Sequence, residues 1–182
     1  MVWIVWSRWL LWIAGFLAFP LAGVVGLAIV DRVDDPLPAL VGGLVAGAII
    51  GAGQWLASQH AVGEPVPWIG ASAVGMGIGL LAGAHAVDYG TDLGELALMG
   101  AITGVPLGIA QALVLRHRWS HAWIWAVSTP PLWALGWTVT TAIGVDVERQ
   151  YVVFGSVGAI AFMALSGLVF EYVRNAGPAV QT

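Results

Sequence analysis

The chain has 182 residues, of which 59% are hydrophobic and only 9% are charged, and its formal net charge is -4. Soluble domains carry about 25% charged residues, so the composition excludes an ordinary water-soluble globule and predicts a protein that spans a lipid bilayer. The absence of cysteine and lysine excludes disulfides, thiolate metal sites and Schiff-base cofactors, and the acidic balance argues against a nucleic-acid partner.

Six apolar runs of membrane-spanning length, about 20 residues each, follow one another with short polar connections. The first run is too long for a cleavable signal sequence, so we expect it to remain as the first helix. The predicted spans are Trp9–Val30, Leu37–Ala57, Val66–Val87, Glu95–Leu115, Ala122–Gly144 and Tyr151–Val173. The sequence therefore predicts an all-α, polytopic membrane protein that forms a single domain over residues 1–182.

Arginine sets the expected orientation, because positively charged loops stay in the cytoplasm. Arg8, Arg116, Arg118 and Arg174 fall on one side of the predicted bilayer, whereas Arg32 and Arg149 fall on the other side among acidic residues. Both termini are therefore predicted to be cytoplasmic. Four tryptophans near the cytoplasmic boundary are expected to act as interfacial anchors, and they are Trp68, Trp119, Trp123 and Trp125.

Two predicted spans carry the same pattern of small residues, 57 positions apart. The first copy is Gly43, Gly47, Gly51 and Gln54, and the second copy is Gly100, Gly104, Gly108 and Gln111. At about 100° per residue, each set occupies roughly one quarter of a helix surface. In a bilayer such glycines let helices approach closely, and a glutamine can hydrogen-bond across the contact. We predict helix packing for the glycines. For the two amides we favour polar packing, with a ligand site near the bundle axis as the alternative.

The same spacing also relates the first and third spans. Ala14, Ala18, Ala22 and Gly26 correspond to Ala71, Gly75, Gly79 and Gly83, which are likewise expected to pack helices together. A weaker third copy runs through Gly155, Ala159, Met163 and Ser166. The pattern predicts three tandem helical hairpins, at about residues 9–57, 66–115 and 122–173, related by a pseudo-threefold axis along the membrane normal. Pro20, Pro106 and the Pro130–Pro131 pair should kink their helices.

No set of side chains suggests a reaction. His60 and His117 are expected in solvated connections rather than at a haem or metal, and His85 with Asp88 has no nucleophile beside it. Carboxylates are expected only at helix ends and in connections, which argues against an ion-coupled pathway. We therefore predict a non-enzymatic protein with no cofactor and no metal. A pigment or quinone among the tryptophans is a weaker alternative.

A short repeated element resembles one found in a group of small bacterial six-helix membrane proteins. The element is G-x-x-Q-W-L followed by Leu-Arg, and it occurs here from Gly51 to Leu56 and, in degraded form, from Gly108 to Arg116. The chain departs from it at Ala112 and at Ser58–Gln59. The resemblance implies a bacterial inner (cytoplasmic) membrane, and it brings no functional residues with it.

Two functions remain open at this point. The leading hypothesis is an accessory or scaffold subunit that acts through helix packing, with the lipid bilayer and either a protein partner or a second copy as its contacts. The alternative is a small-solute binding and translocation module. The substrate-capture subunits of energy-coupling-factor transporters are similar in size and helix number, and their docking helix carries small residues four apart, as Ala14, Ala18 and Ala22 are here.

Overall fold

The structure is a computed structural model that describes residues 2–148 and 151–178, with side chains from Trp6 onward. In these residues the chain is helical throughout apart from its connections and one isolated bridge between Trp119 and Pro178. The elements are α1 (Val2–Ala14), the 3₁₀ turn η1 (Gly15–Leu17), α2 (Ala18–Val30), α3 (Pro36–Ala57), α4 (Pro65–Ala86), α5 (Leu93–Leu115), α6 (Ala122–Ala142) and α7 (Ser156–Asn175). Because α1, η1 and α2 run on without a break, the described part of the chain contains six helical rods.

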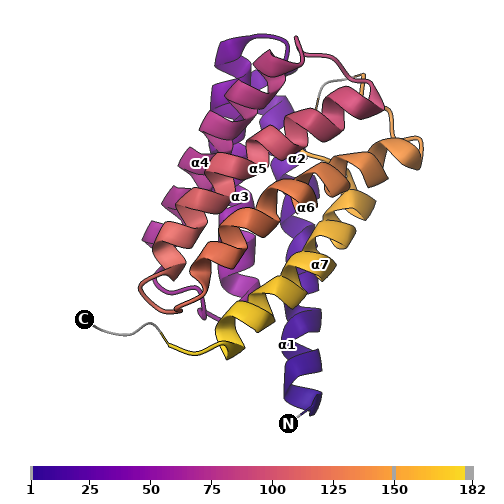
Figure 1. Cartoon of the computed structure of the whole chain (residues 1–182). Coiled ribbons are helices and arrows are strands. Elements are labelled where there is room, and N and C mark those ends of the chain that lie inside the picture. The colour runs from indigo at the N-terminus through magenta and orange to yellow at the C-terminus, as the bar shows by residue number, and fades with distance from the viewer. Residues whose placement is uncertain (1, 149–150, 179–182) are drawn as a thin grey trace.

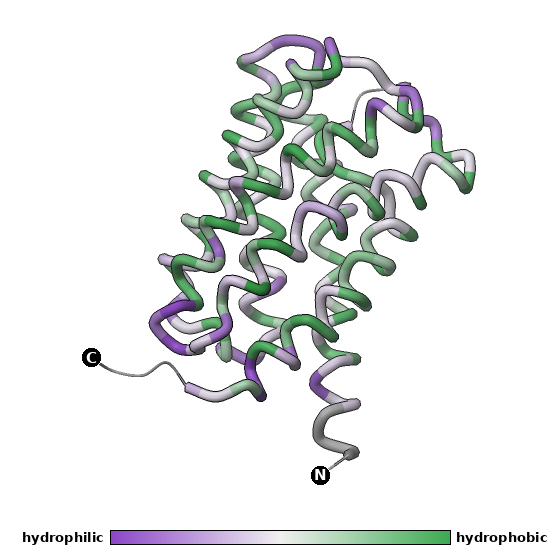
Figure 2. The backbone as a smooth tube through the Cα atoms, viewed as in Figure 1, coloured by the Kyte–Doolittle hydropathy of each residue, from purple (hydrophilic) through white to green (hydrophobic). Residues whose placement is uncertain are grey.

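Five of these rods are long and apolar enough to cross a membrane, counted over the described residues: Trp6–Val30, α3, α4, α5 and α7. The sixth, α6, has 21 residues, but its tryptophans, threonines and prolines lower its hydropathy. Figure 2 shows apolar residues along the rods and polar residues at both ends of the bundle. The prediction of an all-α chain with several membrane-length helices is confirmed.

The helices form a ring in the order in which they occur along the chain. Each of α2 to α6 packs against the helix that follows it, and α7 returns to α1. The connections alternate between the two ends of the bundle, so the N-terminus and the end of α7 lie at the same end (Figure 1). We call this end the terminal end and the other the acidic end.

Local sequence signals explain where the helices begin. At α3, Pro36 follows Asp35, whose side chain accepts a hydrogen bond from the backbone N–H of Leu37 at 3.4 Å. At α5, Asp92 and Glu95 form a reciprocal capping box. Pro65 occupies the first position of α4. These residues satisfy or remove the backbone N–H groups that a helix leaves without partners.

The last helix begins later than the sequence pattern predicts. The expected span starts at Tyr151, but α7 starts at Ser156, and residues 151–155 are not helical. Within this stretch Val152, Val153 and Phe154 are buried. Val152 lies against Gly26 and Gly42, and Phe154 lies in ring contact with neighbouring aromatic side chains. We call residues 151–155 the inserted segment. It is apolar because it fills space between helices, so hydropathy alone cannot separate it from α7.

Candidate functional site

One buried polar or indole side chain from each of the six rods contributes to a cluster at the centre of the ring. We call this set the polar cluster, and its members are Trp12, Gln54, Ser72, Gln111, Trp125 and Ser166. None is more than 2% exposed, and two of them are the glutamines singled out by the repeat. Buried polar groups of this kind are costly unless they are hydrogen-bonded, so their partners decide what the cluster can do.

Gln111 is the centre of the cluster. Its Nε2 donates to Gln54 Oε1 at 3.0 Å and to Ser72 Oγ at 2.8 Å. Its Oε1 accepts a hydrogen bond from Trp125 Nε1 at 2.9 Å. Both N–H groups and the carbonyl of the amide are therefore engaged, and the four side chains come from α3, α4, α5 and α6. Ser72 Oγ in turn donates to the carbonyl of Trp68 at 2.8 Å.

Trp12 extends the cluster to the remaining two rods. Its Nε1 donates to Ser166 Oγ on α7 at 3.1 Å. Its ring meets Trp125 edge-on, with centroids 5.8 Å apart, and stacks on Phe170 at 4.4 Å. The cluster contains no titratable side chain, so it can hold helices in register by hydrogen bonds and ring contacts but has no group to carry a proton.

The glycines of α3 and α5 lie where neighbouring backbones touch. A Cβ added to Gly43 would lie 2.8 Å from the Cα of Gly77, and one added to Gly51 would lie 2.7 Å from the Cβ of Ser72. For Gly47 the nearest atom is the carbonyl oxygen of Ser72. The corresponding positions in α5 lie equally close to α6: Gly100 to Trp137 and Ala134, Gly104 to Pro130, and Gly108 to Thr129. A larger residue at any of these positions would push two helices apart.

The glycines of α4 make the same kind of contact with α5. A Cβ added to Gly75 would lie 2.7 Å from the Cα of Leu107, and Cβ atoms added to Gly79 and Gly83 would lie 2.5 Å from Thr103 O and 2.6 Å from Met99 O. Thr103 Oγ1 also donates to the carbonyl of Gly79 at 3.2 Å. Three consecutive contacts of the ring, from α3 to α6, are thus backbone contacts.

The alanine stripe of the first rod is only partly where it was expected. Ala18 and Ala22 are buried, and the Cβ of Ala18 packs directly against Gly53 on α3. Ala14 is exposed, so its expected packing role inside the bundle is wrong. Gly15 takes that place instead, beside Met163 and Ala57. The tighter turn of η1 accounts for the shift, because a 3₁₀ turn has 3.0 residues and rotates preceding side chains relative to an α-helix.

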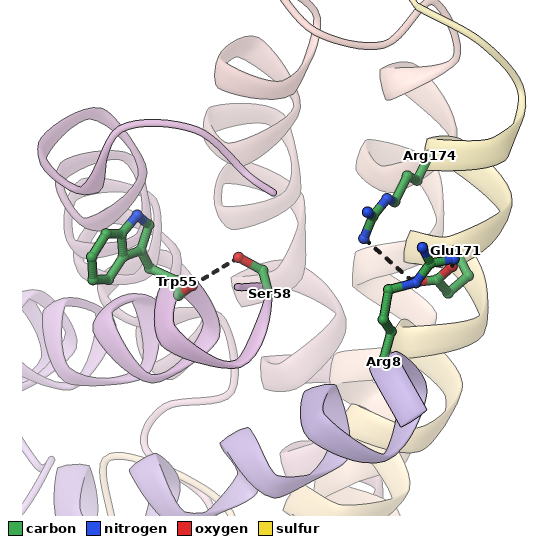
Figure 3. Close-up of polar contacts among 5 residues, drawn as sticks. All are labelled: Arg8, Trp55, Ser58, Glu171 and Arg174. Atoms are coloured by element: carbon green, nitrogen blue, oxygen red, sulfur yellow. Dashed lines mark hydrogen bonds and ion pairs between the residues drawn. The ribbon is translucent and has the colours of Figure 1, made fainter. Parts of the chain in front are cut away.

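A charged contact joins the first and last rods at the terminal end, and the sequence did not reveal it (Figure 3). Arg8 on α1 donates to Glu171 Oε2 on α7 at 3.0 Å, and Arg174 lies 3.9 Å from the other carboxylate oxygen. The Glu171 side chain is only 10% exposed. The sequence feature that could have pointed to Glu171 is its position one turn before the end of α7. Arg8 lies at the same end of the bundle, on the first rod.

Several tryptophans differ from their expected role as interfacial anchors. Trp68 and Trp125 are fully buried, with ring centroids 6.3 Å apart, while Trp123 is 61% exposed. Trp125 donates its indole N–H to Gln111, whereas the Trp68 ring only fills apolar space, because its buried Nε1 has no hydrogen-bond partner among the described residues. Among the histidines, His60 stacks on Trp55 at 4.2 Å, and His85 is exposed. Arg149 lies outside the described residues.

Comparison with known proteins finds no match: no family model, no curated protein and no solved structure matches the chain.

Proposed function

We propose that the protein is a multi-pass membrane protein, with both termini in the cytoplasm of a bacterial cell, that acts without catalysis as an accessory or scaffold subunit. In this proposal the six rods are three tandem hairpins about a pseudo-threefold axis. The bundle offers its first rod to a protein partner or to a second copy. Two kinds of observation support it: contacts that recur at repeat-related positions, and an unusually exposed first rod.

The recurring contacts support the threefold arrangement. Gly51 lies against Ser72, Gly108 lies against Thr129, and Met163 lies against Gly15. The contacted positions 15, 72 and 129 are spaced by 57 residues, as are Gln54 and Gln111. Three copies of one contact are what a repeat would produce, because equivalent surfaces pack in equivalent ways.

The single observation that carries the scaffold function is the burial of the first rod. Only 22% of its apolar window is buried within the chain, against 39% to 50% in the four other membrane-length helices. Leu17, Leu21 and Val24 are each more than half exposed on it. A helix with so little contact inside its own bundle has an outward surface available for another protein.

No contact favours the solute-capture alternative. Ala18 and Ala22 resemble a docking stripe in the sequence, but both are buried within the chain. The polar cluster engages the amide of Gln111 completely with its own side chains. This alternative therefore stays a prediction, to be tested by the melting temperature of the purified protein in the presence of candidate solutes.

The lack of native cysteine makes a direct test practical. Leu21→Cys carries a crosslinker on the exposed face of the first rod, and Ile78→Cys is a matched control at a position 51% exposed on α4. We expect Leu21→Cys in native membranes to give a discrete crosslinked product that Ile78→Cys does not give. Equal crosslinking from both sites, or none from Leu21→Cys at any reagent length, would overturn the proposal.

Membrane topology is tested separately with the same background. Ser120→Cys lies at the terminal end and Asp34→Cys at the acidic end, and both positions are exposed. We expect a membrane-impermeant thiol reagent to label Asp34→Cys in intact cells and Ser120→Cys only after lysis. Reversed labelling, or extraction of the protein by alkaline carbonate, would contradict the proposal.

A further inference from the structure

The two ends of the bundle carry opposite charge. At the terminal end, four arginines (Arg8, Arg116, Arg118 and Arg174) and two glutamates (Glu64 and Glu171) leave a net charge of 4 - 2 = +2. At the acidic end, the described residues carry eight carboxylates and one arginine, so the net charge there is 1 - 8 = -7. Attraction to an anionic surface is therefore confined to the terminal end.

A groove of about 430 Å³ lies at this end, between the α3–α4 connection and the last turn of α5. Its walls are apolar where Val62, Pro67 and Leu113 line it, and polar where Glu64, His117 and Arg118 line it. The apolar surface continues outward, because Val66 is 79% exposed and Leu113 is 48% exposed. We call it the Arg118 groove.

The Arg118 side chain lies against the backbone of the α3–α4 connection. A Cβ added to Gly63 would lie 3.4 Å from Arg118 Nη1, and Gly63 has φ +110°, a conformation that favours glycine. The guanidinium therefore lies along the wall of the groove. Among the described residues no carboxylate lies within salt-bridge distance of it, although Arg8 and Arg174 both contact Glu171.

We propose that the Arg118 groove binds one anionic glycerophospholipid with a glycerol headgroup. The inference rests on the proposal that the helices span a membrane, because the groove then lies at headgroup level. The phosphodiester receives hydrogen bonds from the Arg118 guanidinium, which matches phosphate in charge and geometry. Headgroup hydroxyls donate to Glu64, and an acyl chain follows Leu113 and Val66.

The chemistry of the groove selects this occupant over other anions. The anionic cytoplasmic leaflet concentrates such lipids at a positively charged end. Glu64 opposes a second negative charge, so a phosphodiester is preferred to a phosphate monoester such as phosphatidic acid. The apolar walls favour a lipid over a free phosphate, because they gain stability only by covering an acyl chain.

The test is native mass spectrometry of the full chain in detergent, with phosphatidylglycerol and phosphatidylcholine of identical acyl chains added at equal concentration. We expect retained phosphatidylglycerol to exceed phosphatidylcholine by about fivefold, the effect of one arginine near an anionic surface. Arg118→Gln should abolish this preference. Arg116→Gln removes the same charge two residues away, outside the groove lining, and should keep it.

Two further arms make the outcome decisive. Glu64→Gln should increase retention of phosphatidic acid relative to phosphatidylglycerol, and glycerol phosphate without acyl chains should not displace the bound lipid. Equal losses in Arg118→Gln and Arg116→Gln, equal retention of the two lipids, or displacement by glycerol phosphate would overturn the inference. Carbonate resistance of the same variants is measured in parallel. Its loss would refute the membrane proposal itself, whereas its persistence without lipid selectivity would refute only the groove.

Discussion

The contact between α3 and α4 and the contact between α1 and α7 are built from opposite kinds of residue. The first is made of glycines that bring backbone onto backbone, as at Gly47 and Ser72. The second is made of long side chains: the Arg8–Glu171 pair, and Trp9, whose Nε1 donates to the carbonyl of Ala164 at 2.8 Å. We call them the glycine seam and the side-chain seam.

The difference has an energetic meaning. Backbone contact gains van der Waals energy without ordering side chains, and it tolerates almost no increase in volume. The side-chain seam must order rotamer-rich residues, which costs conformational entropy, but it can adjust to small changes. We therefore expect the ring to be rigid at the glycine seam, and we expect α1 and α7 to separate first, at the side-chain seam.

The largest effect should come from overfilling the glycine seam. Gly47→Leu would drive a side chain into the backbone of Ser72 and Ala73. The expected cost is about 3 kcal/mol or more, which lowers the melting temperature in detergent by roughly 6–12 °C. Gly70→Leu is the matched control, because a Cβ at Gly70 meets nothing within 4 Å. Leu has a higher helix propensity than Gly, so similar losses in the two variants would show that the contact with Ser72 and Ala73 does not set the effect.

The next effect concerns the polar cluster, which joins both seams. Gln111→Leu leaves the indole N–H of Trp125 and the hydroxyl of Ser72 without their Gln111 partner, and should cost about 1–3 kcal/mol. Gln54→Leu removes one acceptor and should cost about 0.6 kcal/mol. Thermal unfolding of both variants and of the double variant measures the coupling. An equal cost for the two single variants would contradict the central place of Gln111.

A smaller effect is expected from the side-chain seam. Arg8→Gln removes the partner of a largely buried carboxylate and should cost about 1 kcal/mol, with the difference from wild type shrinking as salt is added. Arg174→Gln, whose contact with Glu171 is longer at 3.9 Å, should cost less. Melting temperatures over a salt series test this. If Arg174→Gln costs more than Arg8→Gln, the ion pair does not hold the seam.

The smallest effect lies at the acidic end, outside both seams. Burial, followed by the charges of Asp35, Asp88 and Asp34, raises the pKa of Tyr89 above its ordinary value of 10.0. A raised pKa in the folded state means that stability is fully present below pH 10 and is lost as the pH rises through the folded pKa. Tyr89→Phe should flatten the melting temperature between pH 9 and about pH 11. Tyr172→Phe, at an exposed position, is the control, and an identical slope in both variants would argue against Tyr89.

The apolar runs were sufficient to predict the six rods, apart from the start of α7, and the spacing of small residues was sufficient to predict the glycines that lie between them. The packing role of Gly43 and Gly100 could be predicted from the 3.6-residue helical period and the repeated spacing alone. Three features escaped for physical reasons. The shift from Ala14 to Gly15 depends on a 3₁₀ turn, which leaves no mark in hydropathy. The inserted segment is as apolar as a membrane helix because Val152, Val153 and Phe154 are buried between helices. Trp68 and Trp125 were placed at an interface because tryptophan favours both interfaces and cores.

Glu171 and the hydrogen bonds of Gln111 illustrate a further limit. A pair such as Arg8 and Glu171 is separated by 163 residues, and its formation depends on α7 returning to α1. The two glutamines were expected to meet across helices, but their partners Ser72 and Trp125 follow only from the rotation of α4 and α6. Periodicity gives the face of a helix and leaves its neighbour undetermined.

The bond between Gln54 and Gln111 carries one last consequence. A single hydrogen bond between two amides has one donor and one acceptor, so the two glutamines of this pair are not equivalent. Here Gln111 is the donor and Gln54 is the acceptor. This bond gives the centre of the ring a direction, and on α7 Ser166 pairs with Trp12 rather than with an amide.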